Sequence, residues 1–236
     1  MKLFLSADEW DPLAPLQAFV QQQGHQLTCF SETDGHDHLA GFDAGFMYIH
    51  KPLESKVERA LLAYANNGGR LIVLHHGISS SNLKNPDWLR FVGIHLEAPD
   101  AVSHPWKVES NSEHALINLN PGHYVTTNGV EYVDSRQYTS SDSPSASADY
   151  EAVVFVSTEF FRNQHIADGR EKTVLFGSRC EVADTGEIVM QDRGGWFKRT
   201  GSGWLFYFQP GHVAGDFETR AYLQILHNCL TWDGLV

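Results

Sequence analysis

Short apolar runs alternate with amphipathic segments through the first half of the chain. Buried strands are predicted at residues 2–6, 26–30, 44–50 and 70–75. Helices are predicted from Asp11 to Gly24 and over residues 53–67, where apolar side chains recur at helical spacing before a glycine pair. This alternation is typical of βαβ units and predicts a mostly parallel, open α/β sheet with helices on both faces.

The helical pattern disappears after Gly93, where Gly, Asn, Ser and Pro interrupt the apolar runs. We interpret residues 93–150 as a β-rich loop insertion with short strands near residues 106–108 and 124–127, and residues 140–149 as a mobile surface loop. Strands then return at residues 152–157, 173–176 and 204–209, and a closing helix is predicted over residues 216–232. The sequence predicts a single domain over residues 1–236.

Composition narrows the classes of partner. The chain carries 17 Lys and Arg against 29 Asp and Glu, a formal net charge of −12, which argues against nucleic acid or an anionic membrane as partner. Its three cysteines form no CxxC pair, and no apolar signal or membrane-spanning segment is visible. We therefore expect a cytoplasmic protein with a small-molecule substrate, and a homo-oligomer is an open alternative to a monomer.

Histidines follow several of the predicted strands. His75 and His76 come directly after the strand at residues 70–74, His212 follows the strand at residues 204–209 through Pro-Gly, and His50 ends the third strand. Ligands of open parallel sheets bind beyond the carboxyl ends of the strands. Because imidazole transfers protons and binds metals near neutral pH, we expect His75 and His212 to face one cleft.

The insertion adds further candidates. His104, His114 and the pair Glu131-Tyr132 lie within it, and Glu131 is a candidate carboxylate for orienting an imidazole or accepting a proton. A solvated acid in a hairpin is the alternative interpretation for Glu131. Trp196 follows two glycines and is predicted to expose a flat face suited to a sugar ring.

Motifs of several common active sites are missing from the sequence. There is no GxGxxG, GxxxxGK[ST], HExxH or GxSxG motif, and no cysteine lies near His75. Thiol-based acyl transfer at that turn is thereby excluded. His36 and His38 stand in a polar run with two aspartates and are predicted to lie in an exposed loop.

The chain resembles the ThuA-like (trehalose utilisation) family of the class I glutamine amidotransferase-like superfamily. The matching segments are LIVLHHG at residues 71–77, His104-Pro105, His114, Glu131-Tyr132 and GSGWLFYFQPGH at residues 201–212. The resemblance implies a flavodoxin-like core in which His75 takes the nucleophile position, so glutaminase activity is not carried over. It also implies that His212 lies near the superfamily's catalytic histidine. Two departures are Val130 before Glu131, where the family has a second acid, and Trp204 in place of the usual Arg.

Two hypotheses of function follow. The preferred one is a carbohydrate-processing enzyme acting on a sugar or keto-sugar, with catalytic His75, Glu131 and His212, and with substrate bound by His50, His76, His104, Tyr132 and Trp196. A divalent metal ion held by the histidines is an open alternative to direct acid–base chemistry. The second hypothesis is a non-catalytic sugar-binding or regulatory protein that keeps an amidotransferase-like scaffold. A further alternative is a subunit whose pocket a partner completes.

Overall fold

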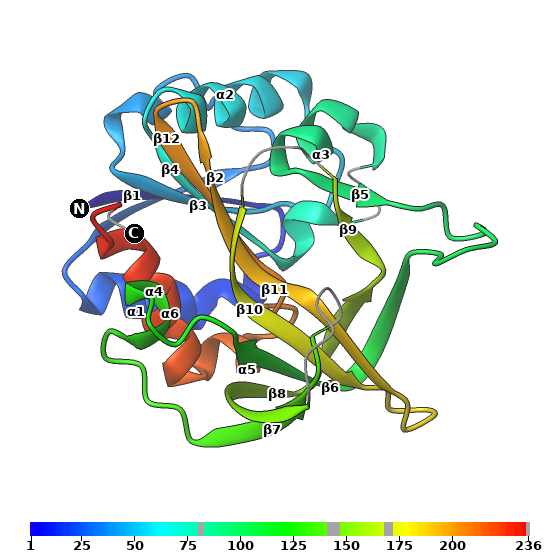
Figure 1. The fold of residues 1–236 in the computed structure, drawn as a ribbon. Coiled ribbons are helices and arrows are strands. Elements are labelled where there is room, and N and C mark those ends of the chain that lie inside the picture. Colours follow the sequence, from blue (N-terminus) through cyan, green and yellow to red (C-terminus); the bar gives the residue numbers. More distant parts are fainter. Residues whose placement is uncertain (80–82, 141–146, 168–171, 235–236) are drawn as a thin grey trace.

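The computed structural model describes residues 1–79, 83–140, 147–167 and 172–234. In this part of the chain, ten strands form one twisted sheet in the order β2-β1-β3-β4-β12-β11-β10-β6-β8-β7 (Figure 1). The five parallel strands are β1 (Lys2–Ala7), β2 (Gln26–Ser31), β3 (Ala44–Tyr48), β4 (Arg70–Leu74) and β12 (Gly203–Phe208). The antiparallel half contains β6 (Lys107–Asn118), β7 (Asp134–Tyr138), β8 (Ala148–Arg162), β10 (Lys172–Glu181) and β11 (Ile188–Thr200). A separate pair joins β5 (Ile94–Leu96) and β9 (Gln164–Ile166).

Helices cover both faces of the parallel half (Figure 1). On one face lie α1 (Ala14–Gln22), α5 (Ala214–Glu218) and α6 (Arg220–Thr231), and on the other α2 (Ser55–Asn66) and α3 (Pro86–Val92). Alternate side chains of each strand enter the two cores, as when Leu3 and Leu5 pack on one side of β1 and Phe4 on the other. The predicted α/β architecture is confirmed, with the parallel arrangement confined to one half of the sheet.

The β-rich region continues the main sheet instead of forming a loop excursion. β6 and β8 are long strands that pair along most of their length. β10 and β11 connect them to β12 of the parallel half. Residues Tyr124–Thr127, predicted as a short strand, form the helical turn α4. The predicted closing helix is broken at Thr219 into α5 and α6. Of the predicted loop at residues 140–149, residues 141–146 lie outside the described residues.

His36 corrects one prediction from the sequence, because its ring is buried and not exposed. The Nδ1 atom lies 2.7 Å from the carbonyl oxygen of Asp34, and Nε2 lies 2.7 Å from Oγ of Ser6. The carbonyl can only accept, so Nδ1 donates to it and Nε2 accepts from the hydroxyl. Burial lowers the pKa of His36 against the opposing effect of Asp34, and the neutral ring ties the loop to β1.

Across the described part of the chain, none of the helices combines the length and apolar character that crossing a membrane would require.

The hairpin between β11 and β12 turns at Gly201, which has a φ of 55° and sits against α2. A Cβ atom there would lie 2.2 Å from the Asn66 carbonyl oxygen, whereas Gly186, with a φ of 67°, has nothing within 4 Å. Gly186→Ala should therefore lose only the backbone preference, about 1–2 kcal/mol. Gly201→Ala should lose about 1–3 kcal/mol more, because backbone must move. Urea unfolding of both variants measures the difference, and equal losses would contradict the close packing.

The burial of His36 should make the free energy of unfolding decrease as the pH falls. Its pKa is lowered in the folded state, so below about pH 6.5 the unfolded chain binds a proton that the folded chain does not. This histidine's contribution is complete above pH 6.5 and is lost as the pH falls. His36→Gln should make the free energy of unfolding depend less steeply on pH between 5 and 7, by at most one bound proton. The exposed neighbour His38 provides the control, and an unchanged slope in His36→Gln would contradict the assignment.

Candidate active site

Four histidines meet at the carboxyl edge of the parallel strands. His50 follows β3, His75 and His76 follow β4, and His212 follows β12. The ring centroids of His75 and His212 lie 5.3 Å apart, those of His76 and His212 5.5 Å, and those of His50 and His76 4.5 Å. The short distance between His75 and His212 confirms their predicted convergence. They meet because the neighbouring parallel strands β4 and β12 end at the same edge of the sheet.

His75 occupies a strained turn at the start of a short 3-10 helix, His75–Ile78. Its φ of 29° is unusual for a residue with a side chain and costs on the order of 1–3 kcal/mol. The ring is fully buried, stacks 4.4 Å from Phe161, and places Nδ1 2.7 Å from the Gln209 carbonyl oxygen. Since that oxygen accepts, Nδ1 carries a proton, and Nε2 is the nitrogen that faces the site.

The loop that carries His212 is fastened by Asp216. One buried carboxylate oxygen of Asp216 accepts from the backbone N–H groups of Gly211, His212 and Val213, at 3.2, 2.8 and 3.4 Å. The same oxygen accepts from the Thr158 hydroxyl at 2.6 Å. Tyr48 and Tyr222 donate to the Gly211 and Pro210 carbonyls, both at 2.8 Å. The loop is thus held from β3, β8 and α6, which fixes where His212 stands.

Glu159 supplies a carboxylate that the sequence reasoning missed. Its Oε2 lies 3.5 Å from Nε2 of His75 and 3.4 Å from Nδ1 of His212. It comes from β8, where the pairing with β6 is irregular and Ser157 has a φ of 54°. The sequence signal was a single acid within the otherwise uncharged run of residues 152–161, between Thr158 and Phe160.

Glu9 is a second carboxylate at the same edge. It follows β1, and its Oε2 lies 3.1 Å from Nδ1 of His76 while Oε1 lies 3.6 Å from Nδ1 of His50. Asp8 accepts from the backbone N–H groups of His50 and Lys51, both at 2.8 Å, which holds the end of β3 beside that of β1. Position after a strand, the signal that identified the histidines, would also have identified Glu9.

The electrostatics favour ionised acid beside neutral imidazole. Burial by itself would raise the pKa of Glu159, but His75 and His212 outweigh it and leave that pKa below its ordinary value. Burial, with the neighbouring histidines, lowers the pKa of His76 to about 2. The pKa of His212 is lowered by burial more than Glu159 raises it. At neutral pH these groups present lone pairs, suited to accepting protons or binding a cation.

A cavity of about 290 Å³ opens onto this cluster. Its walls include His50, His76, Glu159 and His212, together with the aromatic rings of Trp106 and Phe161. Ligand pockets measure roughly 300–1,000 Å³, so this one has room for about one sugar ring. An aromatic wall opposite polar groups suits a sugar, which has apolar faces and a hydroxylated rim.

Three residues predicted for the site lie away from the cluster. Trp196 is fully buried against Tyr207 and exposes no face to a sugar, which corrects that prediction. Glu131 is exposed, and Tyr132 lines a separate cavity and donates to the Thr126 carbonyl. Their segment is held away because α4 packs on α6.

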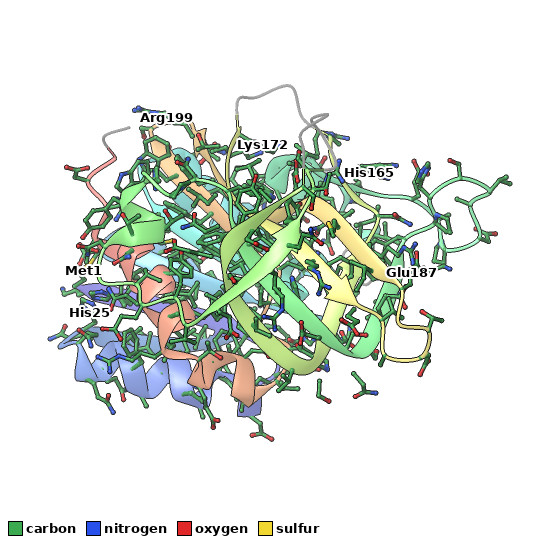
Figure 2. All side chains as sticks on the ribbon, turned by 60° about the horizontal axis from the view of Figure 1, so that its bottom comes forward. Met1, His25, His165, Lys172, Glu187 and Arg199 are labelled. Atoms are coloured by element: carbon green, nitrogen blue, oxygen red, sulfur yellow. The ribbon has the colours of Figure 1, made fainter. Side chains whose placement is uncertain are left out.

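His104 and His114 also stand apart from the cluster. His104 is exposed, with its ring facing His165 at 6.4 Å. His114 is buried and pairs with the Ser178 hydroxyl, at 2.9 Å. Two further histidines lie far from each other: Figure 2 shows His25 beside Met1, on the opposite side of the molecule from His165.

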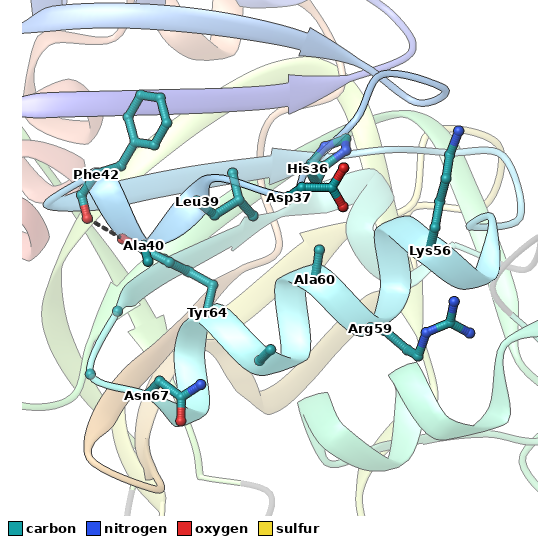
Figure 3. A pocket seen from close by; sticks show the side chains of 13 residues that line it. His36, Asp37, Leu39, Ala40, Phe42, Lys56, Arg59, Ala60, Tyr64 and Asn67 are labelled. Carbon is teal, nitrogen blue, oxygen red and sulfur yellow. Dashed lines mark hydrogen bonds between the residues drawn. The ribbon is translucent and has the colours of Figure 1, made fainter.

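A larger cavity, of about 520 Å³, lies along α2 (Figure 3). It is lined by His36, Lys56, Arg59 and Tyr64 among others, and the Tyr64 hydroxyl donates to the Phe42 carbonyl at 3.3 Å. His36 is the histidine in this lining, and both its nitrogens already have partners. The smaller cavity, which is lined by three histidines and two carboxylates, is therefore the better candidate for an active site.

The fold and the cluster together define an open α/β protein with a histidine at the strained turn after β4. The family model described as ThuA, trehalose utilisation, matches residues 9–233, so the chain belongs to the ThuA family. No curated protein sequence matches the chain.

Solved structures agree on the fold. A ThuA-like protein from Bacteroides uniformis aligns over 98% of this chain and 90% of its own, with a TM-score of 0.65 and 14% identity. A β-galactosidase from a Rahnella species aligns over 97% of this chain and 30% of its own, with a TM-score of 0.57 and 11% identity. A carbohydrate deacetylase aligns over 98% of this chain and 32% of its own, with a TM-score of 0.58 and 10% identity. At these identities the likeness is one of fold.

Asp216 generates a prediction about the loop. Asp216→Ala leaves three backbone N–H groups and the Thr158 hydroxyl without their acceptor, which should cost about 1–3 kcal/mol of stability. Asp87→Ala removes an exposed carboxylate paired with Arg90 and should cost less than about 1 kcal/mol. Urea unfolding compares them. Similar stabilities for the two variants would show that the carboxylate does not hold the loop.

Proposed function

We propose that this protein is a carbohydrate-processing enzyme that acts on a sugar or keto-sugar related to trehalose or another disaccharide. The observation that carries the proposal is the convergence of Glu159, His75, His76 and His212 on a cavity with aromatic walls. Membership in a trehalose-utilisation family supports the substrate class.

The geometry suits proton transfer beside a carbonyl group. Glu159 is partly exposed at the cavity and is ionised at neutral pH, so it can remove a proton from the carbon next to a carbonyl. His212 also lines the cavity, with Nδ1 3.4 Å from Oε2 of Glu159, and its other ring nitrogen can donate to the carbonyl oxygen as negative charge develops there. Return of that proton to the former carbonyl carbon, with transfer of the neighbouring hydroxyl proton to the former carbonyl oxygen, completes an isomerisation with no other reactant.

His75 has the role of a positioning residue. Its ring is fully buried and is locked through Nδ1 to the Gln209 carbonyl, so it acts on the reacting atoms through Glu159. His212 and Glu159 line the cavity and can touch a substrate. His50 and His76 also line it and are proposed to bind substrate hydroxyl groups.

Exchange of substrate hydrogen with deuterium oxide tests this proposal. With 3-keto-trehalose or 3-keto-glucose as substrate, the protein should catalyse hydrogen exchange at the carbon next to the carbonyl. Proton NMR measures the rate as the loss of that hydrogen's signal. Glu159→Gln and His212→Ala should slow the exchange by about 10²–10⁴-fold, the usual contribution of an acid or base. Glu131→Gln and His104→Ala, matched in type but outside the cluster, should keep the full rate.

Two results would contradict the proposal. One is exchange that persists at full rate in both Glu159→Gln and His212→Ala. The other is tight calorimetric binding of these sugars with no exchange or turnover, which would favour a non-catalytic sugar-binding protein.

A further inference from the structure

Three buried imidazole nitrogens at the site have no hydrogen-bond partner within the described structure. They are Nε2 of His75, Nδ1 of His76 and Nδ1 of His212; Nδ1 of His76 lies 3.1 Å from Oε2 of Glu9, but without the geometry of a hydrogen bond. A buried polar atom left unpaired costs about 1–3 kcal/mol, so native proteins rarely leave three together without a ligand or ion to bind. The rings of His75 and His76 are more than nine-tenths buried, so bulk water does not pair with them freely.

These residues and Glu159 form a compact donor set. One ligand atom from each of His75, His76, His212 and Glu159 lies within 4.8 Å of all the others. A zinc ion has bonds of about 2.0–2.1 Å, so a tetrahedral site places its ligand atoms about 3.4 Å apart. The Oε2 of Glu159 lies 3.5 Å from His75 and 3.4 Å from His212, too long for good hydrogen bonds but close to that spacing.

The surroundings of His75 are those of a metal ligand. Its Nδ1–H donates to the Gln209 carbonyl at 2.7 Å, which fixes the ring and leaves Nε2 free to coordinate. Ligating histidines commonly make such a bond from the nitrogen that is not coordinated. Three imidazoles with one carboxylate match zinc and its neighbours in the first transition row, while Mg²⁺ and Ca²⁺ prefer oxygen ligands.

We propose that His75, His76, His212 and Glu159 bind one divalent transition-metal ion of the zinc type. The more exposed set of Glu9, His50 and His76 shares His76 and lies beside this ion instead of holding it. The inference rests on the same residues as the proposed function, but metal binding needs no sugar and is measured without one.

Calorimetric titration of ZnCl₂ into chelator-treated, dialysed protein tests the site. We expect one equivalent of zinc to bind, with Co²⁺ giving the intense visible absorption of a tetrahedral ion. Glu159→Gln and His212→Ala should weaken binding by at least about 100-fold, because losing even an outer-shell partner costs about 10–100-fold. Both side chains are partly exposed, so these variants should fold, which a thermal melt checks.

Matched variants separate this site from the alternatives. His104→Ala and Glu131→Gln should bind zinc as the wild type does, and Glu9→Gln should lose less affinity than Glu159→Gln. Failure of the folded wild type to bind zinc would overturn the inference, as would equal affinity in Glu159→Gln and His212→Ala, or a larger loss in Glu9→Gln. Zinc binding without sugar turnover would instead leave the site standing and remove the proposed reaction.

Discussion

The candidate site depends on the burial of imidazole rings beside a carboxylate. His75 and His76 are removed from water at the carboxyl edge of the parallel strands, where a charged ring without a partner would be costly. Glu159 stands between His75 and His212. Their positions are set by other contacts: Gln209 for His75, and Asp216 with two tyrosines for the loop of His212. The fold therefore positions His75 and His212 through contacts outside the cluster, without hydrogen bonds between the members of the cluster.

The periodicity of the sequence predicted the parallel half of the fold and the meeting of His75 with His212, because strands that neighbour one another in parallel must end at one edge. It could not predict Glu159, which reaches the site from β8 in the antiparallel half, across an irregular pairing whose register no local pattern encodes. The prediction of Glu131 as a site residue was wrong for a related reason. The packing of α4 on α6, which no local pattern encodes, holds its segment away from the cluster. Trp196 follows two glycines, yet the strand they belong to is central and buries it.

The histidine at the turn after β4 sets the chemistry that this turn can support. The turn keeps a strained backbone at His75 and close packing at Gly77, where a Cβ atom would lie 2.4 Å from Val73. A thiol there would be a nucleophile, whereas an imidazole with its Nδ1 proton committed to a carbonyl is a lone-pair donor. Trp106 and Phe161 line a cavity that has room for about one ring.

A crystallographic electron-density map of the protein at neutral pH tests the arrangement most directly. It should show the Glu159 carboxylate between the rings of His75 and His212, at the 3.4–3.5 Å seen here, with Nδ1 of His75 on the Gln209 carbonyl. A Glu159 side chain turned into solvent, with the two rings opening onto different surfaces, would contradict the account.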